Sequence, residues 1–208
     1  MKNLFKLIYV VAAILLGTSL SFAQQASKKG RDYIIFPKGD TLFCKIKSPF
    51  LEGGKTRYKA DGMKSAVAID PDEIKEYYQA ESNELYVSVM LPDDDEAQFL
   101  QVVENGPIRI YQFFKRGGSA GSFGSYSSAK LWYMSKNFGK LAQIKTNSFF
   151  TGMGTGPRKE RENIFGELLK DKPEVYKKYE DSKKFSFDNI RSLVHLYNTG
   201  TWVEEWDD

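Results

Sequence analysis

Apolar and polar residues alternate along much of the chain between residues 32 and 146, in short runs separated by glycine, asparagine, aspartate and proline. A period of two puts alternate side chains on opposite faces of a β-strand. The pattern predicts strands over residues 32–36, 42–47, 56–60, 65–69, 84–91, 99–104, 108–113, 130–136 and 141–145.

Turn residues join several of these runs into hairpins. Gly39 and Asp40 lie between the first two runs and have the chemistry of a tight turn. Asn105-Gly106 separates two apolar-rich runs, a pattern that favours a type I′ turn because both residues tolerate positive φ. Gly139 marks a third hairpin, and residues 70–78 open like a helical turn that continues into an extended segment.

The pattern changes after Phe150. A glycine-rich linker over 151–157 precedes three segments with apolar residues at helical spacing. They are predicted to be helices over 160–169, from Pro173 onward, and over 187–197. Asn198 and Gly200 are expected to end the last helix.

Strands first and helices last indicate the α+β class. We expect an antiparallel β-rich sheet or open barrel followed by three short C-terminal helices. The predicted division is a flexible lead-in over 24–31, a β-rich domain over 32–150, and a helical extension over 151–208. A single amphipathic helix cannot bury its own apolar stripe, so the extension is expected to pack on the sheet.

The first 23 residues have the features of a secretory signal peptide. Lys2 and Lys6 precede an uncharged apolar run over 7–16, and Ser21-Phe22-Ala23 resembles a cleavage site. The run is shorter than the roughly 20 residues of a membrane span, which disfavours a retained anchor. Cleavage is therefore predicted between Ala23 and Gln24, with the product periplasmic or secreted and without a membrane span.

Composition narrows the classes of partner. The formal charge of the 208-residue chain is +3, and the predicted leader contains two of the basic residues. A nearly neutral mature chain argues against nucleic acid as the main partner. Cys44 is the only cysteine, so no internal disulfide can form, and a lipoprotein cysteine is absent from the cleavage site. Because Cys44 alternates with Leu42 and Ile46, we expect it to be buried rather than paired with another chain.

Familiar catalytic and cofactor motifs are not found. His195 is the only histidine and is expected at a half-exposed surface position, so a zinc site is disfavoured. The acidic run 93–96 lacks EF-hand spacing and is interpreted as a solvated loop. The glycines of 152–156 are followed by Pro157 and Arg158, not by the Lys and Ser/Thr of a phosphate loop. No catalytic residue, metal site or cofactor is predicted.

Aromatic residues supply the one set of candidate ligand contacts. Trp132 and Tyr133, with Trp202 and Trp206, could form a platform for a sugar or peptide. Aromatic residues on strands more often belong to a core, and that interpretation is favoured for Trp132 and Tyr133. Trp206 is expected to be exposed or docked onto the domain.

Four stretches together resemble a group of exported Bacteroidetes proteins. These stretches are Gly39-Asp40-Thr41 with Lys45-Ile46 following, Asp70 to Lys75, Phe99 to Tyr111, and the ending Leu193 to Asn198. The group shares a "GDT…KI" hairpin, a "P-x-x-I" turn and a closing "YN" helix. The resemblance implies a Gram-negative periplasmic or surface setting and assigns no functional residue.

Two functions remain open at this point. The first is a non-enzymatic binding or interaction module of the cell envelope, with an envelope protein or a small ligand as partner. The alternative is a periplasmic hydrolase that uses carboxylates from separate strands, which requires two such groups about 5–10 Å apart in one cleft.

Overall fold

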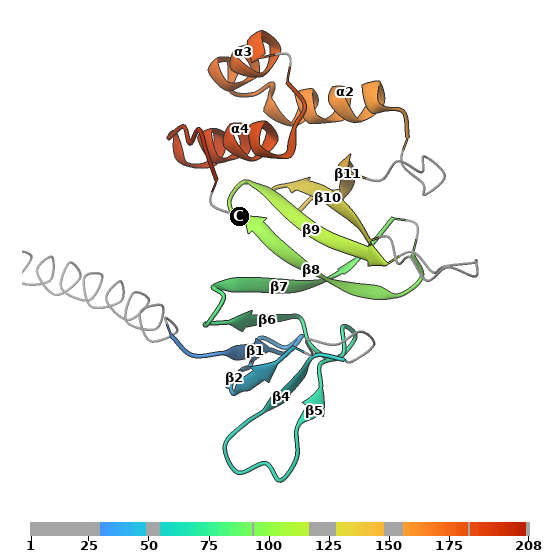
Figure 1. Ribbon diagram of the computed structural model, residues 1–208, viewed down its shortest axis with the longest axis vertical. Helices are drawn as coiled ribbons and strands as arrows, with labels where there is room; N and C mark the ends of the chain where they lie inside the picture. Colours follow the sequence, from blue (N-terminus) through green and yellow to red (C-terminus); the bar gives the residue numbers. More distant parts are fainter. Residues whose placement is uncertain are drawn as a thin grey trace, which may run out of the picture. The chain divides into compact units, whose positions relative to one another are not determined.

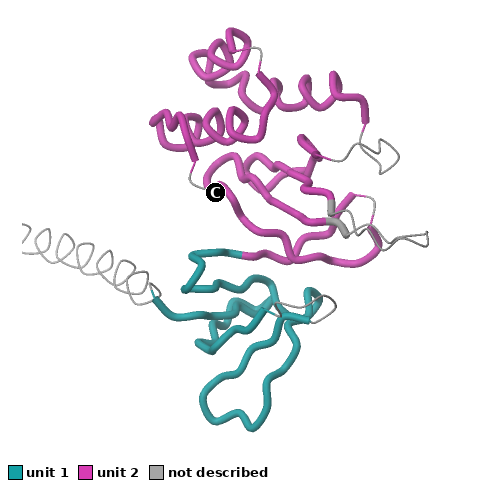
Figure 2. Tube along the Cα trace, viewed as in Figure 1, with its two compact units in different colours: residues 1–85 teal, residues 86–208 magenta. Residues whose placement is uncertain are grey.

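The computed structural model describes residues 30–48, 55–92, 94–116, 128–147, 156–182 and 184–206. The predicted leader, the Gly/Ser-rich segment 117–127 and residues 151–155 lie outside these ranges. The chain divides into two compact units, residues 1–85 and 86–208 (Figure 2). This boundary falls inside the β-rich domain proposed above, and each unit is described by itself.

Six short antiparallel strands build the first unit (Figure 1). One group has the order β6-β1-β2 and the other the order β3-β4-β5. The strands are β1 (Tyr33–Ile35), β2 (Thr41–Phe43), β3 (Lys45–Lys47), β4 (Arg57–Lys59), β5 (Val67–Ala68) and β6 (Glu76–Gln79). Gly39 has positive φ in the predicted turn, and Gly62 has positive φ between β4 and β5, a conformation that glycine adopts without strain.

The predicted strand over 42–47 is in fact two strands that separate at Cys44. The first, β2, pairs with β1, whereas β3 pairs with β4 of the other group. Cys44 donates its N–H to the Asp32 carbonyl at 3.1 Å, and the Asp32 carboxylate accepts the Ile46 N–H at 2.8 Å. The next N–H on that side of the chain, that of Ile46, is thus bound by the Asp32 side chain and not by a backbone carbonyl of β1, and the β1–β2 pairing ends at Cys44. Ile46 is buried as expected, but Cys44 is only half-buried.

The second unit combines five antiparallel strands with three helices on one side of them (Figure 1). The strand order is β7-β8-β9-β10-β11, so consecutive strands are neighbours. Its elements are β7 (Glu84–Met90), β8 (Ala97–Glu104), β9 (Ile108–Arg116), β10 (Ser128–Lys136), β11 (Ala142–Thr146), α2 (Arg158–Leu169), α3 (Pro173–Ser182) and α4 (Phe187–Thr199).

The predicted helix signals at Pro173 and Gly200 are confirmed, whereas Asn198 lies within α4, which continues to Thr199. Helix α3 begins at Pro173, whose missing N–H costs nothing at a first helical position. Ser186 caps α4 by accepting the Asn189 N–H at 3.2 Å. Gly200 ends α4 with φ 78°, and its N–H donates to the Leu196 carbonyl.

The main core of the second unit lies between the helices and β9–β11. Helical residues Phe165, Leu169 and Ile190 are fully buried, and they belong to the same cluster as Ile108 and Met134 of the sheet. Full burial of one such side chain contributes about 1.5–3 kcal/mol. The apolar stripes seen in the sequence are thus buried against the sheet.

The Asn105-Gly106 hairpin differs from its prediction. Strands β8 and β9 do form an antiparallel pair, but neither Asn105 nor Gly106 has positive φ, so the type I′ turn is wrong. The strands are joined by three residues, the last of which is Pro107, and a register shift follows Val102. A two-residue turn does not fit this connection.

The α+β class is confirmed. In both units the strand orders are open among the described residues, so these strands form antiparallel sheets and close no barrel. None of the described helices has the length and apolar character needed to cross a membrane.

Candidate functional site

An open pocket of about 930 Å³ lies in the first unit. Ligand sites in proteins are typically about 300–1,000 Å³, so the space suits a small or medium-sized molecule. The lining contains five basic and three acidic side chains, together with small apolar groups: Arg31, Lys45, Lys47, Arg57, Lys59, Asp32, Asp61, Glu81, Ala60, Ala66 and Ala80.

Strands β3 and β4 bring four of these cations onto one face. Lys45 is paired with Lys59 in the antiparallel register, and Lys47 is paired with Arg57. Directly opposite residues point to the same side of a sheet, as do residues two apart on a strand. All four side chains are exposed, whereas Ile46 between the two lysines points the other way and is buried. We call Lys45, Lys47, Arg57 and Lys59 the cationic face.

Like charges in directly opposite positions destabilise an antiparallel pair by about 0.2–1 kcal/mol. Among the described residues, Lys45, Lys47 and Arg57 make no ion pair that would offset this repulsion. Lys59 reaches only the Lys64 carbonyl, at 3.4 Å. Two repulsive pairs side by side thus lack internal compensation in the described part of the chain.

Protection of a sheet edge explains only half of the cationic face. Lysines on edge strands discourage pairing with other chains, and β3 is an edge strand of its group. However, β4 is the central strand, with β3 on one side and β5 on the other. Arg57 and Lys59 therefore protect no edge, so edge protection does not account for them.

Asp32 joins three segments around the pocket. Its two carboxylate oxygens accept the N–H groups of Ile46, at 2.8 Å, and of Ala80, at 2.9 Å. The three segments joined in this way are distant in the sequence, and all three contribute to the pocket lining, with Asp32, Ala80 and the two lysines that flank Ile46. Asp32 is thus a structural acceptor, and its negative charge is already matched by two donors.

Cys44 also lines the pocket, but as a protonated thiol. Burial, together with the negative charge of Asp32, raises its pKa to about 11. A thiolate is the reactive form of cysteine, so Cys44 is a poor nucleophile at neutral pH. It adds a small apolar surface to the pocket wall.

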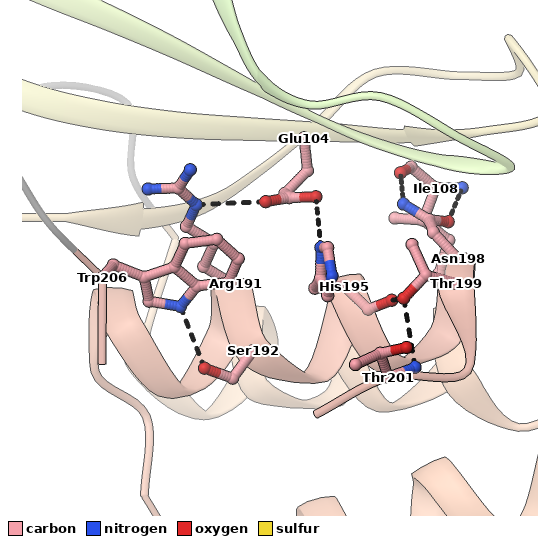
Figure 3. Close-up of polar contacts among 9 residues, drawn as sticks. All are labelled: Glu104, Ile108, Arg191, Ser192, His195, Asn198, Thr199, Thr201 and Trp206. Atoms are coloured by element: carbon pink, nitrogen blue, oxygen red, sulfur yellow. Dashed lines mark hydrogen bonds and ion pairs between the residues drawn. The ribbon is translucent and has the colours of Figure 1, made fainter. Parts of the chain in front are cut away.

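A second polar cluster, in the other unit, joins α4 to the end of β8 (Figure 3). The Glu104 carboxylate is nearly buried, and its oxygens lie 3.1 Å from Arg191 Nε and 3.2 Å from His195 Nδ1. A buried carboxylate needs such partners, because an unpaired buried charge is costly. His195 is about a quarter exposed, and its Nδ1 lies within hydrogen-bond distance of the Glu104 carboxylate.

Trp206 covers this cluster. Its ring lies 3.8 Å from the Arg191 guanidinium and 5.3 Å from the His195 ring, and its Nε1 donates to Ser192 Oγ at 3.0 Å (Figure 3). The ring therefore docks onto α4, one of the two expectations for this residue. The arrangement fastens α4 to the end of β8.

Trp132 and Tyr133 both lie in the interior of the second unit. Trp132 is 3% exposed and donates its Nε1 to Gln112 Oε1 at 3.0 Å, and Tyr133 is 8% exposed. Their burial accords with the core interpretation that the sequence favoured. Neither residue lines the pocket of the first unit.

The cationic face was missed by sequence reasoning, although one signal was present. The pattern Lys45-Ile46-Lys47 and the pattern Arg57-Tyr58-Lys59 each put two cations on one side of a strand. Only the pairing of β3 with β4 brings the two patterns together. No group of three or more His, Cys, Asp or Glu residues that could hold a metal ion occurs within the described ranges.

No protein-family description, curated protein or solved structure matches this chain. Function must therefore be argued from the residues themselves.

Proposed function

We propose that this protein is an exported, non-enzymatic binding module whose first unit binds an anionic ligand in the pocket over β3 and β4. The observation that supports the proposal is the register that sets Lys45 opposite Lys59 and Lys47 opposite Arg57. An anion placed over these pairs converts two repulsions into attractions. The site is then more stable occupied than empty.

Two of the three acids in the pocket lining already have partners, which favours binding over hydrolysis. A hydrolase built on carboxylates needs one group that gives a proton and another that accepts it or attacks. Asp32 has both oxygens engaged by backbone N–H groups, and Asp61 lies 3.9 Å from Arg31. The basic side chains are the larger set, and they suit the retention of an anion.

Export rests on the features of the first 23 residues and on the resemblance to exported Bacteroidetes proteins. We propose cleavage between Ala23 and Gln24, with release of the mature chain into the periplasm or beyond the cell. The measurement is the intact mass of the protein recovered from the periplasm of a Gram-negative host that expresses the full chain. Recovery of the uncleaved 208-residue chain from the cytoplasm would contradict this part of the proposal.

The binding proposal is tested by thermal denaturation of the protein with and without added anions at low ionic strength. A ligand at 100 times its dissociation constant stabilises the folded state by about 2.7 kcal/mol, which is a measurable rise in Tm. We expect tripolyphosphate, as a first probe, to raise Tm in the native protein. The increase should be lost in Lys47→Glu/Lys59→Glu.

Lys38→Glu is the matched control. Lys38 is exposed, belongs to the same unit and is absent from the pocket lining, so the change in charge is the same for each substitution. Its counterpart is the single variant Lys47→Glu, which should lose part of the Tm increase. Equal loss in Lys38→Glu and Lys47→Glu would mean that net charge, and not the cationic face, attracts the anion. That result would reject the site.

A further inference from the structure

The arrangement of the cationic face restricts the anion that it can hold. Directly opposite residues in an antiparallel pair have Cβ atoms about 4.5–5.5 Å apart. Residues two apart on one strand are separated by about 6.6 Å. Lys45 and Lys59 thus form one cationic pair, and Lys47 and Arg57 form a second pair about one side-chain spacing away. The site has two adjacent positions for negative charge.

The residue types favour a particular anionic group. Three of the four side chains are lysines, whose compact ammonium groups act as point charges with freely rotating donors. The bidentate fork of arginine, which matches carboxylates and phosphates alike, occurs once in the cationic face. Tetrahedral oxyanions, with oxygens directed to several sides, can accept from two ammonium groups at the same time.

The rest of the pocket has room for the part of a ligand that connects these groups. Ala60, Met63, Ala66 and Ala80 give the lining small apolar surfaces beside the cations. Ala60 is buried and Met63 accepts its N–H at 3.2 Å, so this part of the wall is held by its own contacts. The volume of about 930 Å³ exceeds that of a single phosphate or sulfate many times over.

We infer that the pocket takes a ligand bearing two or more neighbouring phosphate or sulfate groups, with one group over each cationic pair. This inference rests on the proposed function and adds to it the class of anion and the number of charged groups. Phosphate and sulfate esters share the tetrahedral oxyanion that the lysines recognise. The experiment below separates these two sources.

The test is isothermal titration of the full mature chain at low ionic strength with five probes. They are inorganic phosphate, pyrophosphate, tripolyphosphate, sucrose octasulfate and citrate. We expect tripolyphosphate to bind at least tenfold more tightly than inorganic phosphate and than citrate, which has a comparable charge on carboxylates. The ratio between tripolyphosphate and sucrose octasulfate distinguishes a phosphate ligand from a sulfate ligand.

Substitution of one lysine in each cationic pair measures how much each pair contributes to the affinity for tripolyphosphate. One charge–charge contact at the protein surface corresponds to roughly a fivefold change in affinity. We expect Lys59→Gln and Lys47→Gln each to weaken tripolyphosphate binding about fivefold, and the double variant about 25-fold. Lys38→Gln should change it less than twofold. All three lysines are exposed, and circular dichroism of each variant checks that the fold is retained.

Two results would overturn the inference and leave the proposed function intact. The first is citrate binding as tightly as tripolyphosphate, because charge alone would then decide. The second is inorganic phosphate binding as tightly as tripolyphosphate, because one position would then suffice. A single-stranded oligonucleotide that binds more tightly than every small probe, with the same response to the lysine variants, would replace the small polyanion by nucleic acid. Failure of all probes to bind would reject the inference and the proposed function together.

Discussion

Gly106 is the position where one added methyl group should have the largest traceable effect. A Cβ at this residue would lie 2.5 Å from Cγ of Asn198, well inside van der Waals contact. The φ of Gly106 is not positive, so alanine can adopt the backbone and only this contact opposes it. Asn198 in turn binds Ile108 twice, accepting its N–H at 3.0 Å and donating to its carbonyl at 2.7 Å (Figure 3).

The expected loss follows from these two hydrogen bonds. Gly106→Ala must displace the Asn198 amide, which leaves the N–H and carbonyl of the fully buried Ile108 without that partner. Each hydrogen bond contributes about 0.5–1.5 kcal/mol. We therefore expect Gly106→Ala to lower the free energy of unfolding by about 1–3 kcal/mol. Asn198→Ala, which removes the same two bonds, should cost a similar amount.

The double variant makes the argument testable. Once Asn198 is alanine, the methyl group at position 106 meets no amide, so Gly106→Ala should add less than about 0.5 kcal/mol. The coupling between the two substitutions is then about 1–2 kcal/mol, measured by urea denaturation followed by circular dichroism. Asn105→Ala, at the exposed neighbour, is the control and should cost less than about 0.5 kcal/mol. Additive losses in the double variant would refute the reasoning.

Three further predictions concern Asp32, Cys44 and Trp206. Asp32→Ala leaves the N–H groups of Ile46 and Ala80 without their acceptor, and should lower stability by about 2 kcal/mol in thermal denaturation; no measurable loss would contradict its role. The pKa of Cys44 is raised from 9.0 to about 11, so its labelling by iodoacetamide at pH 8 should be about 100-fold slower than in the urea-unfolded chain. The thiol ionises at a lower pH in the unfolded chain than in the folded chain, so the free energy of unfolding should fall as the pH rises from about 9 to 11. Equal labelling rates of the folded and the unfolded chain would contradict the raised pKa of Cys44. Trp206→Ala removes the ring from Arg191 and should lower the free energy of unfolding by about 1 kcal/mol in urea denaturation. Trp206→Phe keeps a ring at this position and should lose less; equal losses in the two variants would show that the ring contact contributes nothing.

Much of the local structure could be predicted because its causes are local. Pro173 and Gly200 set helix boundaries through their own backbone restrictions. Gly39 and Gly62 sit in turns for the same kind of reason. The strand that divides at Cys44 could not be predicted, since its alternation continues unbroken and the interruption comes from the side chain of Asp32.

The candidate site was hidden from the sequence for a different reason. The clearest chemical residues, His195 and the tryptophans, turned out to have polar or core partners within the second unit. The pocket instead uses ordinary lysines, which are frequent in this chain and have no local pattern that marks a site. Their significance lies in which strand stands opposite which.

The sequence by itself determined the order of strands and helices, most of their boundaries and the class of the fold, because hydrophobic period, capping and turn chemistry act over a few residues. The tertiary structure alone decided that Lys45 and Lys47 face Lys59 and Arg57, that Asp32 binds segments 14 and 48 residues away, and that Asn198 lies against Gly106. These contacts depend on strand register and on the packing of a helix against a hairpin. Both are set by the summed burial of many side chains, which no short stretch of sequence specifies.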